Sequence, residues 1–239
     1  MRTFQLAAPP RAPAIVGGNG HERKSPCILS PSLSTRLEPM SLTLIIIAVT
    51  VVVSLAAWKQ PQLLYRLIYH GPSVHKGEWW RLVSHGFIHA DGNHLLFNMF
   101  TLYFFGRFME QLLVPGIGAL GFILFYLVGI VVAILPSHFR HGRNPGYRSL
   151  GASGAVSAVL FGFILVKPWS MLFVMFVPVP AIVFAVLYVA YSLWADRRGK
   201  DNVNHSAHLV GGLWGVVFLL ILEPRLLPRF MEQVVRIPW

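Results

Sequence analysis

The sequence predicts an all-α polytopic membrane protein, a bundle of six transmembrane helices with a long amphipathic loop between the first helix and the second. Two observations support this class. Of the 239 residues, 55% are hydrophobic and only 12% are charged, and the mean hydropathy is +0.60, which is too apolar for a water-soluble domain of this length. The apolar residues are also gathered into six stretches separated by polar or proline-containing segments.

A helix needs about 20 apolar residues to cross the hydrocarbon core, and the six stretches approach that length. The loop before the second span, residues 59–93, is amphipathic, and its Trp79 and Trp80 suit the membrane–water interface. Pro178 and Pro180 are expected to end a re-entrant or interfacial segment ahead of the fifth span. The expected spans are residues 41–58, 94–112, 116–135, 151–167, 181–195 and 205–222.

The two ends of the chain lie outside these spans. Residues 1–39 are rich in Pro, Ser, Gly and Arg, so we expect a disordered tail, one that is not translated if synthesis starts at Met40. This tail has no apolar core of the kind that a signal peptide contains. The expected organisation is therefore the tail 1–39, a six-helix membrane domain at 40–223 and a short basic C-terminal tail at 224–239.

The formal net charge is +11, yet the basic residues are spread between the apolar stretches. This distribution is typical of lipid head-group anchors, so membrane lipid is an expected partner and nucleic acid is not. Lys and Arg divide evenly between the two membrane faces, and only the flank of the first span favours a cytoplasmic N-terminus. Cys27 is the only cysteine, which excludes a disulfide framework.

Polar residues that can do chemistry stand at the starts of the second, fourth and sixth spans, which all lie on one face of the membrane. They are His94 and Asn98, Ser153, and His205 and His208. Polar groups inside a membrane are costly unless paired, so their convergence indicates a functional site, with structural hydrogen bonding between helices as the alternative.

The fourth span is short. Ser153 to Lys167 gives roughly 21–23 Å of helix, against a hydrocarbon thickness of about 30 Å. Ser153 is therefore expected below the membrane surface, where water must reach it through a cavity.

The fourth and sixth spans each carry a small residue at every fourth position, the spacing that lets two helix backbones approach closely in lipid. Ser153 and His208 flank these rows, so close packing brings the serine hydroxyl within reach of an imidazole that takes its proton. A plain serine–histidine hydrogen bond is the alternative. The rows are Gly154, Ala158 and Gly162, and Ala207, Gly211 and Gly215.

Attack on an amide creates an oxyanion, which needs hydrogen-bond donors. The first N–H groups of the fourth span have no partner in their own helix, and His94 and Asn98 share one face of the second span. No carboxylate is placed to orient the histidine, so the prediction is a Ser–His dyad rather than a triad. Spacing alone barely separates His205 from His208 as the base; His208 is favoured because it lies deeper and on the small-residue row.

A metal site is the alternative from another enzyme class. Its ligands would come from His85, His89, His94, His205 and His208. Against it stand the scarcity of carboxylates and the absence of a His-Glu-x-x-His motif. We therefore predict no metal and no cofactor. A transporter is disfavoured because the spans carry neither central charges nor paired inverted repeats.

Together these motifs resemble the bacterial rhomboids, a family of intramembrane serine proteases. "GASG" at 151–154 is similar to the nucleophile motif, "HLLFN" at 94–98 to the oxyanion motif and "AHLVGG" at 207–212 to the base motif, in the family's order. "WWRLVSHGFIH" at 79–89 resembles the Trp-Arg element of the family's first loop, and Glu110 stands where the family has an acidic partner for that arginine. The similarity extends from about residue 41 to residue 222.

The resemblance implies a rhomboid-like fold in which Ser153 is the nucleophile, His208 the general base, and His94 and Asn98 stabilise the oxyanion. It implies an intramembrane endopeptidase of the bacterial inner membrane that cleaves single-span or multi-span membrane proteins within or beside their transmembrane segments. Some members carry an aromatic residue one turn after the nucleophile, stacked on the base; this chain has Ser157 there, so another residue must hold His208. A catalytically silent membrane adaptor or chaperone is the alternative within the family.

Overall fold

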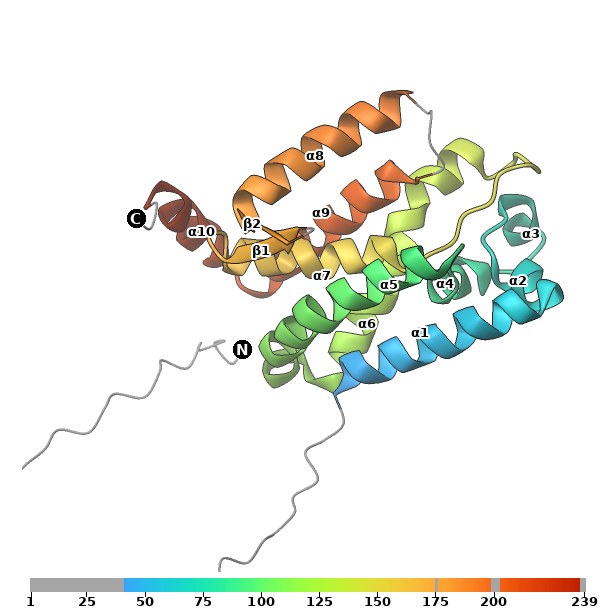
Figure 1. Ribbon diagram of the computed structural model, residues 1–239, viewed down its shortest axis with the longest axis horizontal. Coiled ribbons are helices and arrows are strands. Elements are labelled where there is room, and N and C mark those ends of the chain that lie inside the picture. The colour runs from blue at the N-terminus through green and yellow to red at the C-terminus, as the bar shows by residue number, and fades with distance from the viewer. Residues whose placement is uncertain (1–40, 175, 199–202, 237–239) are drawn as a thin grey trace, which may run out of the picture. The chain divides into compact units, whose positions relative to one another are not determined.

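The computed structural model describes residues 41–174, 176–198 and 203–236, and the expected tail at 1–39 lies outside the described residues. Within them the chain is mostly helical (Figure 1). The longer helices are α1 (Leu42–Lys59), α5 (Gly92–Thr101), α6 (Arg107–His141), α7 (Ser153–Val166), α8 (Ala181–Arg198), α9 (His205–Leu222) and α10 (Leu226–Val235). The shorter elements are α2 (Pro61–Leu67), α3 (Gly71–His75), α4 (Arg81–Ser84), the 3₁₀ turn η1 (His85–Phe87), the π-helical turn η2 (Leu102–Gly106), β1 (Met171–Val174) and β2 (Val177–Pro180).

The second and third expected spans fall in the consecutive elements α5, η2 and α6. The break between them is at Gly118, whose φ of 74° and ψ of 173° lie outside the helical region and divide α6 into two helices. By length and composition, three helical runs in the described residues suit a membrane crossing: Leu42–Lys59, Gly92–His141 and His205–Leu222. α7 is apolar but shorter, and α8 ends in the charged residues Asp196, Arg197 and Arg198.

α7 lies in the middle of the bundle, with α5, α6, α8 and α9 packed around it (Figure 1). Ten of its 14 residues are buried, which leaves hardly any face toward the surroundings. The predicted close approach of α7 and α9 is confirmed: a Cβ at Gly211 would collide with the carbonyl of Gly154, and one at Gly215 with the carbonyl of Ala158. These glycines therefore set the helix separation by main-chain contact.

The loop between the first two spans is built from α2, α3, α4 and η1 instead of irregular chain. Arg81 stabilises this loop. Its guanidinium donates hydrogen bonds to the carbonyls of Tyr65 (2.6 Å) and Ile68 (2.8 Å) and forms an ion pair with Glu78. Trp79 and Trp80 are exposed, as expected of interfacial side chains.

The expected pairing of Arg81 with Glu110 is wrong. The Glu110 carboxylate accepts hydrogen bonds from the Ser41 hydroxyl (2.6 Å) and from the N–H groups of Leu42 (2.7 Å) and Thr43 (2.9 Å). These groups belong to the first turn of α1, where N–H groups have no partner within the helix and a negative charge is favoured. Arg81 binds the chain that follows the other end of α1, so about 27 Å of helix separates the two residues.

Residues 171–174 and 177–180, the strands β1 and β2, pair in an antiparallel arrangement in which Met171 lies opposite Pro180 and Phe173 opposite Pro178. The sequence predicted a re-entrant or interfacial segment here and no strand. The two prolines end β2 where α8 begins, and the N–H of Ala181 donates to the Ser170 carbonyl (2.9 Å). The expected C-terminal tail contains α10, and the Trp169 indole donates to the Gln233 carbonyl in it (2.7 Å).

Candidate functional site

Ser153 is the first residue of α7 and follows a turn that needs glycine. Gly151 has a φ of 117°, and a Cβ there would lie 2.7 Å from the imidazole of His94. The N–H of Gly151 donates to the His85 carbonyl (2.9 Å), and the N–H of Ala152 donates to Nε2 of His89 (3.3 Å). The segment that leads to Ser153 is thus fixed by the loop that precedes α5.

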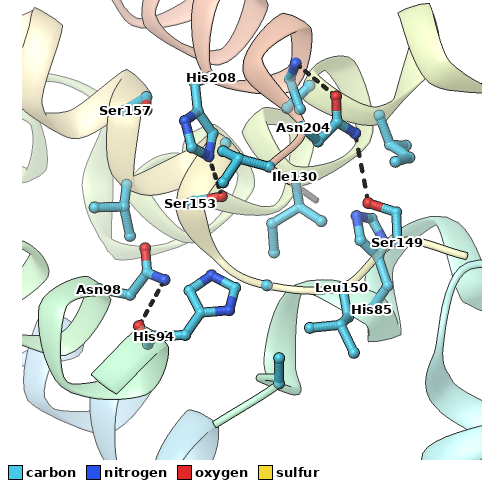
Figure 2. Close-up of a pocket in the computed structure, with 18 of the residues that line it drawn as sticks. His85, His94, Asn98, Ile130, Ser149, Leu150, Ser153, Ser157, Asn204 and His208 are labelled. Atoms are coloured by element: carbon cyan, nitrogen blue, oxygen red, sulfur yellow. Dashed lines mark hydrogen bonds between the residues drawn. The ribbon is translucent and has the colours of Figure 1, made fainter. Parts of the chain in front are cut away.

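The Ser153 hydroxyl and the His208 imidazole meet across the α7–α9 contact. Oγ of Ser153 lies 2.8 Å from Nε2 of His208, within hydrogen-bond distance (Figure 2). His205 is buried one turn earlier on α9 and faces Tyr191 edge-on. The structure therefore separates the two histidines: the imidazole beside the Ser153 hydroxyl is that of His208.

His94 and Asn98 lie one turn apart on α5, on the side that faces the start of α7 (Figure 2). The Asp91 carboxylate caps this helix by accepting from the N–H of His94 (2.9 Å), and the Asn98 amide donates to the His94 carbonyl (3.0 Å). Neither side chain has a hydrogen bond to Ser153 in the described part of the chain. They line the same pocket as Ser153 and His208.

This pocket has a volume of about 1000 Å³ and brings the four predicted site residues together. Its apolar walls include Phe97, Leu160 and Phe184, and its polar side includes Ser149 and Asn204. Ser153 and His208 are both partly exposed to it. The pocket therefore has room for an extended peptide segment against the hydroxyl and the imidazole.

Asn204 is a site residue that the sequence analysis missed. Its side-chain oxygen accepts from the N–H of Ala207 (3.1 Å), which caps α9, and its amide donates to the hydroxyls of Ser137 (2.8 Å) and Tyr147 (3.2 Å). Asn204 thereby joins the start of the helix that carries His208 to the end of α6. An asparagine directly before an apolar helix is a recognisable N-cap signal.

His89 is a second missed residue, considered only as a metal ligand. Because Nε2 accepts from Ala152, Nδ1 carries the proton and donates to the Ser54 hydroxyl of α1 (3.1 Å). Burial, with a smaller contribution from His94, lowers the pKa of His89 to about 4. Burial likewise lowers the pKa of His85 to about 4. Both imidazoles are thus held neutral near pH 7.

The structure also bears on two other roles for the histidines, as ligands of a metal ion and as members of a triad with a carboxylate. Among the described residues, no group of three or more His, Cys, Asp or Glu side chains has the geometry to hold a metal ion. No carboxylate of a described residue has a hydrogen bond or ion pair with His208. The ring of Tyr188 from α8 instead stacks on the imidazole, with centroids 6.2 Å apart and planes inclined by 18°.

Comparison with known families and proteins identifies the family of the chain. Residues 76–225 match the family model described as the Rhomboid domain. The chain is 33% identical over 150 residues to RHOMBOID-like protein 12, mitochondrial, of Arabidopsis thaliana, a match that covers 56% of this chain and 44% of that protein. It is 34% identical over 155 residues to Rhomboid-like protein 11, chloroplastic, of the same plant, over 61% of this chain and 53% of that protein.

The chain therefore spans about half the length of these two plant relatives. It is also 25% identical over 181 residues to the Rhomboid protease GlpG of Haemophilus influenzae, over 74% of this chain and 90% of that protein. The match and the apolar helices together indicate an integral membrane protein. Because the Rhomboid domain takes up more than half of the chain and contains all four residues that converge on the pocket, the chain belongs to the rhomboid family.

Proposed function

We propose that this rhomboid family member is an intramembrane serine endopeptidase that cleaves other membrane proteins within or beside their transmembrane segments. The observation that carries the proposal is the 2.8 Å distance between Oγ of Ser153 and Nε2 of His208 inside a pocket large enough for a peptide. The names of relatives such as the Rhomboid protease GlpG support it. The substrate class is single-span or multi-span membrane proteins in a lipid bilayer.

In the proposed reaction, Nε2 of His208 takes the proton from the Ser153 hydroxyl as Oγ attacks the carbonyl carbon of the scissile peptide bond. The tetrahedral intermediate carries its negative charge on the former carbonyl oxygen. The N–H groups at the start of α7, with His94 and Asn98, donate hydrogen bonds to that oxygen. His208 then gives its proton to the leaving amine, and the C–N bond breaks to leave an acyl ester on Ser153.

Water completes the cycle. His208 takes a proton from a water molecule that attacks the ester carbonyl, and returns it to Oγ when the acid product leaves. Since α7 has only 14 residues, about 21 Å of helix, water reaches Ser153 through the pocket and not through lipid. None of these reaction steps needs a metal or a cofactor.

The same proposal includes a six-span arrangement made of α1, the run from α5 to Gly118, the rest of α6, and α7, α8 and α9. We place the protein in a bacterial inner membrane with a cytoplasmic N-terminus. In this arrangement one span separates the span of α5 from α7, and one span, α8, separates α7 from α9. The first residues of α5, α7 and α9 therefore lie on the same face of the membrane, where the pocket lies.

Purified protein in detergent, incubated with a single-span model substrate, tests the proposal. Ser153→Ala and His208→Ala are each expected to lower cleavage by at least about a thousandfold. His75→Ala is the matched control, because His75 is an exposed histidine that does not line the pocket, and it should retain cleavage within about threefold. Cleavage that survives in Ser153→Ala would refute the assignment.

The two alternatives give different results in the same assay. A membrane adaptor would bind partners equally well before and after Ser153→Ala and would cut none of them. A metalloenzyme would lose activity in a chelator and would contain stoichiometric metal by elemental analysis. We expect cleavage to be unchanged by chelators.

A further inference from the structure

The His208 ring has few partners that fix its tilt. Its Nε2 lies against Ser153, and the ring of His205 meets it edge-on at a centroid distance of 6.2 Å and an angle of 74°. A histidine ring rotates broadly about its last side-chain bond unless something flat or hydrogen-bonded holds it. In the part of the chain that the structure describes, the nearly parallel face on this imidazole is that of Tyr188.

The contact between Tyr188 and His208 has the geometry of an offset stack. The planes are inclined by only 18°, and the centroid distance of 6.2 Å falls within the range of about 4.5–7 Å that aromatic pairs occupy. Tyr188 belongs to α8, whereas the nucleophile is on α7 and the base on α9. A third helix therefore touches the dyad.

Tyr188 is itself held in place from both sides. Phe184, one turn earlier on α8, stacks on it at 5.5 Å and 27°, and Phe161 of α7 packs against it at 5.8 Å. Its hydroxyl lies 3.5 Å from Oγ of Ser157, one turn after Ser153 on α7. Tyr188 therefore contacts α7 through Phe161 and Ser157, and α9 through His208.

We propose that Tyr188 is the positioning residue of the His208 base, so that the dyad depends on α8 as well as on α7 and α9. This inference rests on the proposed function. Tyr188 acts through the face of the imidazole and keeps Nε2 directed at Ser153. The side chain of Ser157 cannot do this, because a hydroxyl has no flat surface to stack.

The docking of α8 supports this role. Small or polar residues lie buried on its inner side, namely Ala181, Ala185, Ser192 and Ala195, while Val186 and Leu187 on the outer side are exposed. The inner side thus brings α8 close enough to α9 for Tyr188 to lie over His208. Without the Tyr188 ring, the His208 imidazole should still be present, but its Nε2 should no longer be held toward Ser153.

The test measures the nucleophilicity of Ser153 separately from substrate binding. The rate at which a small fluorophosphonate labels Ser153 depends on His208 and needs no transmembrane substrate. Tyr188→Leu keeps most of the side-chain volume but removes the flat ring, and it should label about tenfold more slowly than wild type. Tyr188→Phe keeps the ring and should label within about twofold of wild type.

Peptide cleavage is expected to show the same separation between the rate of the chemical step and substrate binding. Tyr188→Leu should lower kcat by about tenfold and leave KM within about twofold, whereas a residue that only contacts substrate would raise KM. Tyr191→Ala is the matched control: the same residue type, one turn further along α8, facing His205 instead of His208. It should label at the wild-type rate.

The outcomes separate this inference from the proposed function. If wild type labels at Ser153 and Tyr188→Leu labels equally fast, the positioning role is wrong and the protease assignment stands. Should Tyr188→Leu unfold, Tyr188→Met is labelled in its place, because its flexible side chain fills the same space without a flat face, and labelling as fast as wild type also contradicts the role. If wild type does not label at Ser153, the proposed function itself fails.

Discussion

Gly211 of α9 lies directly against the main-chain carbonyl of Gly154 of α7, with no room for a methyl group between the two helices. The contact is between backbones, so no side chain can rotate away to relieve a collision. It involves the residue that directly follows Ser153 on α7, and it lies one turn after His208 on α9. The position of the imidazole relative to the hydroxyl therefore depends on this glycine.

Gly211→Ala should destabilise the protein and lower activity. The added Cβ must push α9 from α7, at a cost of about 1–3 kcal/mol, and Nε2 of His208 moves out of reach of Ser153. Gly212→Ala is the matched control, because its Cβ would meet only the side chain of Phe161, 3.0 Å away, which can shift. Thermal unfolding and peptide cleavage in detergent should show the larger loss for Gly211→Ala; equal losses would contradict the main-chain explanation.

Glu110→Ala should destabilise the start of α1. The carboxylate holds two N–H groups and one hydroxyl, and hydrogen bonds to a charged group contribute about 1.5–3 kcal/mol each at most. Chemical unfolding should show a loss of at least about 2 kcal/mol. Glu232→Ala, at an exposed carboxylate on α10, should change stability by less than about 0.5 kcal/mol.

A double-mutant cycle between Arg81 and Glu110 distinguishes the observed partners from the pairing that the family resemblance implied. Because the two residues lie at opposite ends of α1, their alanine substitutions should be additive within about 0.5 kcal/mol. A larger coupling energy would mean that they interact in the membrane.

Stability should fall as the pH is lowered from about 6.5 to about 4. The pKa of His89 and of His85 is about 4 in the folded protein and about 6.5 in a free side chain, so the unfolded state binds more protons within that window. Protonation of His89 also ends the hydrogen bond that Nε2 accepts from Ala152. Above pH 6.5 this contribution is constant.

The check is thermal unfolding across that pH range, with His89→Gln as the comparison. Glutamine can still accept from Ala152 but does not titrate, so the decline with falling pH should be shallower in the variant. Parallel declines in the two proteins would rule out His89 as a source of the effect.

Asn98→Ala should lower kcat by about a hundredfold or more with little change in stability. The proposed role is to donate a hydrogen bond to the oxyanion, and removal of one such donor costs about 10²–10³ in rate. Asn93→Ala on the same helix is the matched control, since Asn93 is exposed and does not line the pocket. A loss confined to KM would assign Asn98 to substrate binding instead.

The sequence predicted the ends of a helix well where an apolar run is bounded by polar residues. The expected sixth span coincides with α9, and the expected first and fourth spans differ from α1 and α7 by at most two residues at each end. The rows of small residues, spaced one turn apart, also indicated the contact between α7 and α9, because that spacing is typical of helices whose backbones approach closely in lipid.

The sequence could not show which groups the side chains meet across the bundle. Arg81 binds main-chain carbonyls, which every residue carries and no pattern marks. The proposed role of Tyr188 depends on how α8 packs against α9, and the spacing of residues within α8 does not predict how two helices pack. The pairing of β1 with β2 was missed because a short apolar run without alternation fits a strand and a re-entrant segment equally well.

The close contact of Gly215 with the Ala158 carbonyl, like that of Gly211 with the Gly154 carbonyl, fixes the distance between α7 and α9 through main-chain atoms and not through the walls of the pocket. Phe97, Leu160 and Phe184 line the cavity but do not set the separation of α7 and α9. Substitutions at these three side chains should therefore change which peptides fit, while the 2.8 Å distance between Oγ of Ser153 and Nε2 of His208 stays the same.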